Sequence, residues 1–343
     1  MRVTISDVAR EAGVSASTVS RVIHDNPRIS TETKVRVRDA MEQLHYVPNA
    51  LARGLARSST GNLGLILPNS SDNLFMNPFF IEAMRGIGVE AQSRGYNIMF
   101  SFSNNEEEEV GFIRNYIHSR WVDGIILLAS RENDRCMAYL QDRGFPFVVV
   151  GRPEDAGSAL WVDNDNFHAV YNATNLLIDR GSRCPAFAGG PEAFSVTRDR
   201  LNGFRQALRI RGLRDDDGMV GFGADFSEAE GSRTMERILS AGTPDAVVTT
   251  DDHIAFGVLE ALENAGAGTV AVVGFNNTLR GRYQRPTLSS VDVNPAALGA
   301  GAAGLLIDHV RGVGEPVDHR IVDTVLIERE TTAPERFPPS AER

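Results

Sequence analysis

The residue types that enzymes and metal sites use most often do not form a recognisable site in this sequence. None of the seven histidines belongs to an HExxH motif or to a defensible serine–histidine–aspartate arrangement. The two cysteines, Cys136 and Cys184, lack CxxC or metal-ligand spacing, so we expect small buried residues in a reducing cytoplasm. Gly189 and Gly190 lack the other residues of a GxGxxG or P-loop motif. We therefore expect no enzymatic activity, no cofactor and no metal site.

Two acidic stretches could be ion sites, but helix starts explain them better. Asp163 and Asp165 have the spacing of a calcium loop, yet the glycine and the terminal glutamate of such a loop are missing. Four glutamates from Glu106 to Glu109 lie where a helix is expected to begin, and the helix dipole favours negative charge there. We interpret the first stretch as a polar turn that caps a helix and the second as a solvated helix start.

Small polar residues near the N-terminus, together with Arg21, are stronger candidates for a functional site than the acidic stretches, because their pattern suits contacts with DNA. Thr4 can cap a first helix, with Asp7 as the reciprocal partner of a capping box. Gly13 can end that helix, because glycine readily adopts positive φ. Ser15 or Ser17 then opens a second helix. This is the helix-turn-helix pattern, in which the second helix enters the DNA major groove.

Two further helices are expected before residue 60. Ser30 can cap the first of them. Pro48 can begin the second, because its missing N–H costs nothing in the first turn of a helix. The Ala-, Leu- and Arg-rich residues after Pro48 form a helix that is too short to be stable alone, so we expect it to need a partner or a surface.

The charge of the chain is divided unevenly along its length. Residues 1–58 carry nine lysines and arginines against six aspartates and glutamates, a net charge of +3. The whole chain has a net charge of −10, so the remainder carries −13. The basic end is therefore the part suited to phosphate, and its modest charge favours binding as a dimer.

Three motifs together resemble the LacI/GalR family of bacterial transcription regulators. They are ISDVAREAGVSASTVSRVI from Ile5, STET from Ser30 and YVPNALARGLA from Tyr46. The resemblance implies an α/β fold class, with an N-terminal helix-turn-helix DNA-binding domain plus a periplasmic-binding-protein-like core of two doubly wound α/β subdomains. It also implies a homodimer on palindromic double-stranded operator DNA and a small-molecule sugar effector in the cleft between the subdomains.

The resemblance assigns DNA contacts residue by residue. Ala16, Ser17 and Arg21 match positions that face base edges, and an arginine can bond to guanine O6 and N7 together. Leu55 matches a wedge that enters the minor groove, and Arg53 would reach phosphate or the groove. Positions that usually touch phosphate are matched by Thr4, Ser20, His24, Ser30 and Thr33. The other expected DNA-binding residues are Ser6, Thr18, Asn49 and Ala52.

From Gly61 onward, short apolar runs alternate with amphipathic helices. Strands are expected at 63–67, 97–100, 124–128, 147–150, 186–188, 220–222, 246–250 and 270–274. Helices are expected at 78–94, 106–120, 166–180, 198–211, 227–240 and 253–265, with one more ending at Gly144. Continuous apolar strands separated by helices indicate parallel sheets covered on both faces, and two such series indicate two doubly wound subdomains.

The resemblance implies that the chain crosses between the subdomains three times, near 159–163, 288–293 and 316–323. We accordingly expect a helix-turn-helix domain over 1–47 and a hinge helix with linker over 48–60. The first core subdomain spans 61–160 with about 292–318, and the second spans 161–290 with about 319–332. The tail, 333–343, is Pro-rich and lacks heptads, which favours a dimer over a tetramer built on a coiled coil.

Sugars require apolar or aromatic faces for their C–H surfaces and forked polar groups for their hydroxyls. Arg200 matches the family's effector-binding arginine, and Asp251 and Asn276 match hydroxyl-binding positions at the carboxyl ends of strands. Phe226 matches an aromatic position that stacks on the ligand, although core packing is an equal alternative for the phenylalanines. The other expected effector-binding residues are Asn77, Phe79, Phe80, Ser130 and Arg131.

The finer match is to the maltose-operon repressors of the family, through motifs such as Asn77-Pro78-Phe79-Phe80. It implies that maltose or another α-glucoside weakens operator binding. Alternatives are a nucleoside, purine or other sugar effector, or a periplasmic-type sugar-binding protein without regulation. The last would need an export signal and has no use for residues 1–58. No run of eighteen apolar residues and no signal-peptide core is present, so we expect a cytoplasmic protein without a membrane partner.

Overall fold

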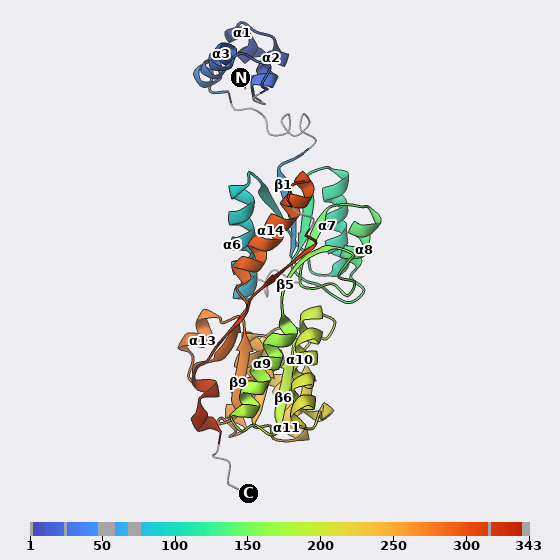
Figure 1. The fold of residues 1–343 in the computed structure, drawn as a ribbon, viewed down its shortest axis with the longest axis vertical. Helices are drawn as coiled ribbons and strands as arrows, with labels where there is room; N and C mark the ends of the chain where they lie inside the picture. The colour runs from blue at the N-terminus through green and yellow to red at the C-terminus, as the bar shows by residue number, and fades with distance from the viewer. Residues whose placement is uncertain (1–2, 24–25, 47–58, 68–76, 315–316, 338–343) are drawn as a thin grey trace. The chain divides into compact units, whose positions relative to one another are not determined.

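The computed structural model describes residues 3–23, 26–46, 59–67, 77–314 and 317–337 (Figure 1). The chain divides into two compact units. The N-terminal unit comprises Met1–Gly61 with Arg120–Asp123, and the core unit comprises Asn62–Ser119 with Gly124–Arg343. Among the described residues, no helix combines the length and the apolar character that crossing a bilayer requires.

Three helices lie in the described part of the N-terminal unit, and their ends follow the predicted signals. They are α1 (Ile5–Glu11), α2 (Ala16–Ile23) and α3 (Thr31–Gln43). The Asp7 carboxylate accepts hydrogen bonds from the backbone N–H and the hydroxyl of Thr4, at 2.9 and 2.7 Å. Gly13 has a φ of +62° and follows α1. Of the two candidate serines, Ser15 opens α2, because its hydroxyl accepts the Thr18 N–H at 3.2 Å.

A small apolar core holds these helices together. Ser30 accepts the Thr33 N–H and so begins α3, as predicted. The three helices bury small side chains against one another, and such side chains allow helices of this length to pack closely. The buried residues are Val8, Ala9, Ala12, Val19, Val22, Val37 and Ala40. Since isolated helices of this length are marginal in water, this shared core is what stabilises them.

The core unit contains two six-stranded sheets. The first is parallel throughout and has the order β11 (His319–Val322), β5 (Leu160–Asn164), β4 (Phe147–Val150), β3 (Gly124–Leu127), β1 (Asn62–Leu67) and β2 (Asn97–Phe102). The helices that go with it are α6 (Pro78–Ser93), α7 (Glu106–His118), α8 (Arg135–Asp142) and α14 (Pro295–Arg311).

The second sheet has the order β12 (Val325–Ile327), β10 (Ser289–Asp292), β9 (Ala271–Phe275), β8 (Ala246–Thr249), β6 (Pro185–Gly189) and β7 (Val220–Phe222). Only the β12–β10 pair is antiparallel. Its helices are α9 (Asn166–Asp179), α10 (Ser195–Arg211), α11 (Glu228–Ala241), α12 (Asp252–Asn264) and α13 (Leu279–Tyr283). The predicted core of two doubly wound α/β subdomains is confirmed. Figure 1 shows the two subdomains end to end within the core unit.

Helix α6 is held against α14 by glycines that allow the backbones to approach closely (Figure 1). A Cβ atom on Gly86 would lie 2.0 Å from the carbonyl oxygen of Ala296, and one on Gly299 would lie 2.1 Å from that of Ala83. Any larger residue at either position would force the helices apart. This close packing fixes the N-terminal end of α6, which carries several expected effector-binding residues.

The sheets correct two predicted subdomain boundaries. Strand β5 lies beside β4 in the first sheet, so the boundary expected between residues 160 and 161 falls too early. Strand β11 also lies in the first sheet, beside β5, and so is not part of the second subdomain. The second subdomain receives only β12 from this region. The sequence does not predict these boundaries because the strands join the sheet through backbone hydrogen bonds, which do not depend strongly on side-chain type.

Two smaller expectations also need correction. Cys136 is buried as expected, but Cys184 is exposed, because it lies where the chain enters β6. The C-terminal segment is not simply a tail from residue 333: Phe337 packs in the core of the second subdomain, after the short 3₁₀ turns Glu330–Thr332 and Pro334–Arg336. Residues 338–343 lie outside the described part of the chain.

Candidate functional site

A cavity of about 110 Å³ in the core unit brings together residues of both subdomains. Eight of the nine residues expected to bind an effector line it: Asn77, Phe79, Phe80, Ser130, Arg200, Phe226, Asp251 and Asn276. The sequence positions of these residues span two hundred residues, so their convergence depends on the fold. We refer to this cavity as the effector pocket.

The ends of helices and strands position the polar groups of the effector pocket. Asn77 caps α6 and accepts the Phe79 N–H at 3.0 Å, with Pro78 in the first turn of the helix. Asp251 follows β8, caps α12 and accepts the His253 N–H at 2.7 Å. Asn276 follows the neighbouring strand β9. Carboxyl ends of parallel strands are where open α/β sheets bind ligands.

Asp251 connects these groups across the pocket. Its Oδ2 atom accepts hydrogen bonds from the side-chain amides of Asn77, at 3.0 Å, and Asn276, at 2.8 Å. Asn77 belongs to the first subdomain and the other two to the second, so the network joins the subdomains. Its carboxylate and amide groups form a forked set of donors and acceptors suited to the hydroxyl groups of a sugar.

Arg200 places a buried positive charge at the same pocket. Its guanidinium donates to the Asn166 side-chain oxygen at 2.9 Å and to the Thr250 carbonyl oxygen, and lies 4.1 Å above the Phe275 ring. Burial lowers the pKa of Arg200 to about 10, against the charges of Asp163 and Asp251, which raise it. The side chain therefore remains a cation at neutral pH.

Aromatic rings form the apolar part of the lining. Phe79 and Phe80 meet edge to face, with 5.3 Å between ring centroids, and Phe79 packs against the cores of both subdomains. Phe194 and Phe226 meet edge to face at 5.6 Å. Ring faces of this kind suit the C–H surfaces of a sugar, whereas the amide and carboxylate groups suit its hydroxyls.

The expected DNA-reading residues lie on the N-terminal helices. On α2, Val19 and Val22 are buried whereas Ser17 and Arg21 are exposed. Ser17 and Arg21 are four residues apart and so share one face of the helix. The other expected DNA-binding residues in the described range are Thr4, Ser6, Ala16, Thr18, Ser20, Ser30 and Thr33, all at least partly exposed. His24, Asn49, Ala52, Arg53 and Leu55, and most of the hinge segment, lie outside the described residues.

Comparison with known proteins identifies the family. The sequence-family model for bacterial regulatory proteins of the lacI family matches residues 4–49. The family model for a periplasmic binding protein-like domain matches residues 174–332. The transcriptional regulator CelR of Thermobifida fusca is 33% identical over 341 residues, 96% of this chain and 98% of CelR. The chain belongs to the LacI family. It is therefore a DNA-binding transcription regulator, and the predicted family is confirmed.

Other LacI-family proteins are similar over much of the chain. The regulator MalR of Streptococcus pneumoniae is 40% identical over 259 residues, 75% of this chain and 79% of MalR. The solved CelR–cellobiose complex has 31% identity and a TM-score of 0.75, and covers 96% of this chain and 100% of that one. The Lac repressor dimer bound to operator has 23% identity and a TM-score of 0.82, covers 97% and 99% of the chains, and shares the fold.

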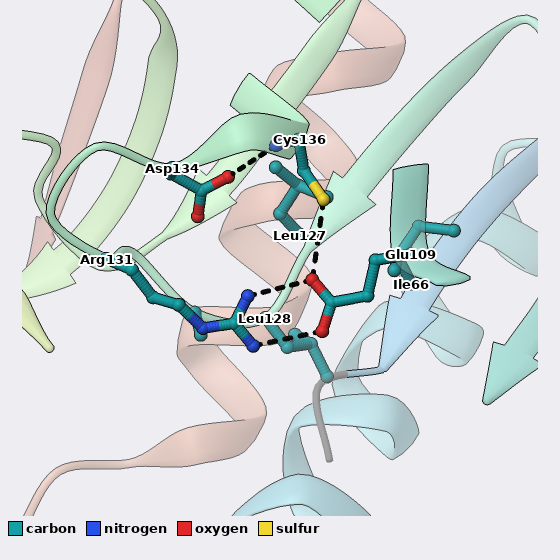
Figure 2. A pocket seen from close by; sticks show the side chains of 8 residues that line it. Ile66, Glu109, Leu127, Leu128, Arg131, Asp134 and Cys136 are labelled. Carbon is teal, nitrogen blue, oxygen red and sulfur yellow. Dashed lines mark hydrogen bonds and ion pairs between the residues drawn. The ribbon is translucent and has the colours of Figure 1, made fainter. Parts of the chain in front are cut away.

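Arg131 is the one expected effector residue that does not line the pocket of this LacI-family chain. Its guanidinium instead pairs with Glu109 through two hydrogen bonds, at 2.8 and 3.0 Å (Figure 2). The structure also corrects the interpretation of Glu106–Glu109 as entirely solvated, because Glu109 is only 3% exposed. A buried carboxylate requires a partner, and Arg131 supplies it.

Sequence reasoning missed several other residues of the effector pocket. Asp163, Asn164, Phe194 and Thr250 line it without having been expected to. Thr250 could have been found, because it precedes Asp251 at the same strand end. The sequence predicts a capping turn around Asp163, and Asp165 does cap α9, with its carboxylate accepting the His168 N–H at 3.1 Å. Phe194 carries no signal, because it lies in a loop before α10.

Proposed function

We propose that this regulator is a repressor that binds a palindromic operator as a homodimer, and that maltose or another α-glucoside in the effector pocket controls its affinity for the operator. The observation that carries the proposal is the composition of that pocket. Aromatic rings of Phe79, Phe194 and Phe226 and the forked polar network around Asp251 line a single cavity. Both kinds of surface are needed to bind a sugar.

The DNA-binding half of the proposal rests on α2. Its exposed face presents Ser17 and Arg21, and an arginine at this position can discriminate guanine from other bases by about 1–3 kcal/mol. A net charge of +3 on residues 1–58 gives one subunit only a modest attraction to phosphate. Two subunits on two half-sites would add their contacts, which supports a homodimer on a palindrome.

The choice of sugar rests on the relatives. The regulator MalR of S. pneumoniae is 40% identical, and a solved structure with 25% identity is described as a probable maltose operon repressor of the same name. The CelR–cellobiose complex, at 31% identity, favours a second candidate, a β-linked glucose disaccharide. Both candidates are glucose disaccharides, so the polar network and the aromatic rings suit either. Because relatives of this chain are transcription regulators, we propose no catalytic role, and we expect it to act in the cytoplasm, where operator DNA is found.

The mechanism that we propose is a population shift between two arrangements of the subdomains. Asn77 on the first subdomain binds Asp251 on the second, so a sugar that bonds to both would favour the closed arrangement. A ligand shifts such an equilibrium only by its difference in affinity for the two states. We expect the closed arrangement to favour the state with lower affinity for the operator.

A titration of operator with and without sugar tests the proposal. The operator is first selected from a pool of random duplexes by the full-length protein, and its binding is then followed by fluorescence anisotropy. We expect maltose to weaken binding, whereas adenosine and hypoxanthine leave it unchanged. Tighter binding with maltose would contradict induction, and a response to cellobiose or to a purine alone would reassign the effector.

A further inference from the structure

Two short segments join the subdomains directly beside the effector pocket. Ser130 to Glu132 belong to the first subdomain, and residues 193 to 198 belong to the loop and first turn of α10 in the second. The Glu132 N–H donates to the carbonyl oxygen of Ala193 at 2.9 Å, and the Ser195 N–H donates to that of Ser130 at 3.1 Å. We call this pair of segments the clasp. It is distinct from the three places where the chain itself crosses between the subdomains.

Side chains add to the clasp on both sides of these backbone bonds. The hydroxyls of Ser130 and Ser195 lie 2.9 Å apart, within hydrogen-bonding distance. At the other end, Arg198 forms an ion pair with Glu132 at 2.8 Å. Since Ser130 lines the effector pocket, any movement of the clasp also moves part of the pocket wall.

An ion pair between the buried Glu109 and the partly buried Arg131 fixes the centre of the clasp. Arg131 lies between Ser130 and Glu132, and both oxygens of Glu109 accept hydrogen bonds from its guanidinium (Figure 2). Glu109 also accepts hydrogen bonds from the hydroxyl of Ser103 and the thiol of Cys136, each at 3.4 Å. Burial raises the pKa of the Cys136 thiol, so it remains a protonated donor to the carboxylate.

Arg131 reaches the second subdomain through an aromatic ring. Its guanidinium carbon lies 5.4 Å from the centroid of Phe194, and the two residues also face each other in an isolated antiparallel bridge. Phe194 lines the effector pocket and meets the edge of Phe226, which lines it too. The chain of contacts therefore runs from Glu109 through Arg131 to two aromatic walls of the pocket.

We propose that Arg131, held by Glu109, is a positioning residue that closes the clasp and fixes the Phe194 wall of the effector pocket. The inference rests on the proposed function, because it takes the cavity to be the sugar site. If the ion pair only stabilised the fold, replacing it would change stability without specifically loosening the clasp. A buried ion pair contributes little net stability compared with a well-packed neutral pair, so replacing both charges need not unfold the protein.

The test uses the full-length protein with both charges replaced, Glu109→Gln together with Arg131→Met, and a matched control, Glu107→Gln. Glu107 lies in the same helical turn as Glu109 but is exposed, so the control makes the same Glu→Gln substitution without touching the clasp. Hydrogen exchange of the ligand-free protein reports on the Glu132 and Ser195 amides, and calorimetry reports the affinity for maltose. We expect about tenfold faster exchange of peptides containing these amides and about tenfold weaker maltose binding in the double variant, with no change in the control.

Unchanged exchange of the clasp peptides in a folded double variant would overturn the proposal, even if its melting temperature had fallen. If the double variant does not fold, Arg131→Lys replaces it, because lysine keeps the charge but cannot bond to both carboxylate oxygens with a planar fork. The proposal would also be overturned if the Arg131→Lys variant matched wild type both in the exchange of the clasp peptides and in its affinity for maltose. If the wild-type protein binds none of the sugars, the proposed function fails, while the exchange measurement still decides the clasp.

Discussion

The N-terminal helices and the effector pocket each present an arginine to an expected ligand, but the two side chains stand in opposite surroundings. Arg21 is exposed on α2, in the part of the chain with a net positive charge. Arg200 is only 5% exposed and is held by Asn166, the Thr250 carbonyl and the Phe275 ring, in the acidic remainder of the chain.

Exposed Arg21 and buried Arg200 differ in how strongly water and salt affect their interactions with a ligand. An exposed cation attracts a phosphate backbone over about a Debye length, ~8 Å at physiological ionic strength, and salt screens that attraction. A buried cation has already lost its water, and its fixed partners hold it in one geometry. We therefore expect the operator interface to be adjustable by salt, and the effector pocket to be selective and insensitive to salt.

The largest effect should come from removing the buried charge. We expect Arg200→Met to weaken maltose binding about 100-fold, because hydrogen bonds from a charged group contribute about 1.5–3 kcal/mol each and 1.4 kcal/mol corresponds to tenfold. Operator binding without sugar should persist. Calorimetry measures the affinity, and Arg209→Met, at an exposed position of the same helix, serves as the control. An affinity for maltose within threefold of wild type would remove Arg200 from the effector site.

The exposed arginine should have a somewhat smaller effect. We expect Arg21→Ala to weaken operator binding about 10- to 100-fold, since a bidentate contact with guanine discriminates by about 1–3 kcal/mol. Maltose affinity should not change. Anisotropy titrations measure the loss, with Arg10→Ala as the control, because Arg10 is exposed on α1 but pairs with Asp7. Equal losses in both variants would mean that Arg21 contributes charge and not base recognition.

The two regions also differ in how far sequence could predict them. The N-terminal helices depend on local signals, namely Thr4 with Asp7, Gly13 and Ser30, and each signal acts where it was expected. In the pocket, Asp251 and Asn276 could be placed because strand ends gather at one edge of a parallel sheet.

What sequence could not predict depends on contacts between distant segments. Glu109 reads as one of four equivalent glutamates at a helix start, and nothing nearby in the sequence shows that it alone is buried beside Arg131. Strands β5 and β11 likewise join the first sheet through backbone pairing. The sequence pattern shows neither which glutamate is buried nor which strands pair, because both depend on contacts that exist only in the folded chain.

Ionic strength offers a direct test of the contrast between the two regions. We expect operator affinity to fall at least tenfold between 50 and 200 mM salt, because cations that neutralise phosphates release counterions. Maltose affinity should change less than twofold over the same range. Anisotropy and calorimetry on the same preparation measure both quantities. Parallel losses would indicate that salt acts on the fold as a whole and would remove the distinction.

The smallest effect concerns pH and the buried carboxyl group of Asp163, which accepts a hydrogen bond from Asn166, the residue that also bonds to Arg200. Burial raises the pKa of Asp163 to about 6, from its ordinary value of 3.8. The folded protein therefore binds a proton more tightly than the unfolded chain, and this group lowers the free energy of unfolding as pH rises from about 4 to about 6. The sign is opposite to that of an aspartate held in an ion pair, whose contribution to stability grows as pH rises from its lowered pKa in the folded protein to its ordinary value of about 4.

In the pocket, the protonated form of Asp163 would be a weaker acceptor for the Arg152 and Asn164 N–H groups, which it bonds at 2.9 and 2.7 Å. We expect maltose affinity to fall about two- to fourfold between pH 7 and pH 5, and Asp163→Asn to flatten this part of the profile. His253, whose pKa is raised by its bond to Asp251 despite burial, titrates in both proteins, so the difference between the two profiles isolates Asp163. Identical profiles for the two proteins would show that the buried carboxyl does not communicate with the sugar.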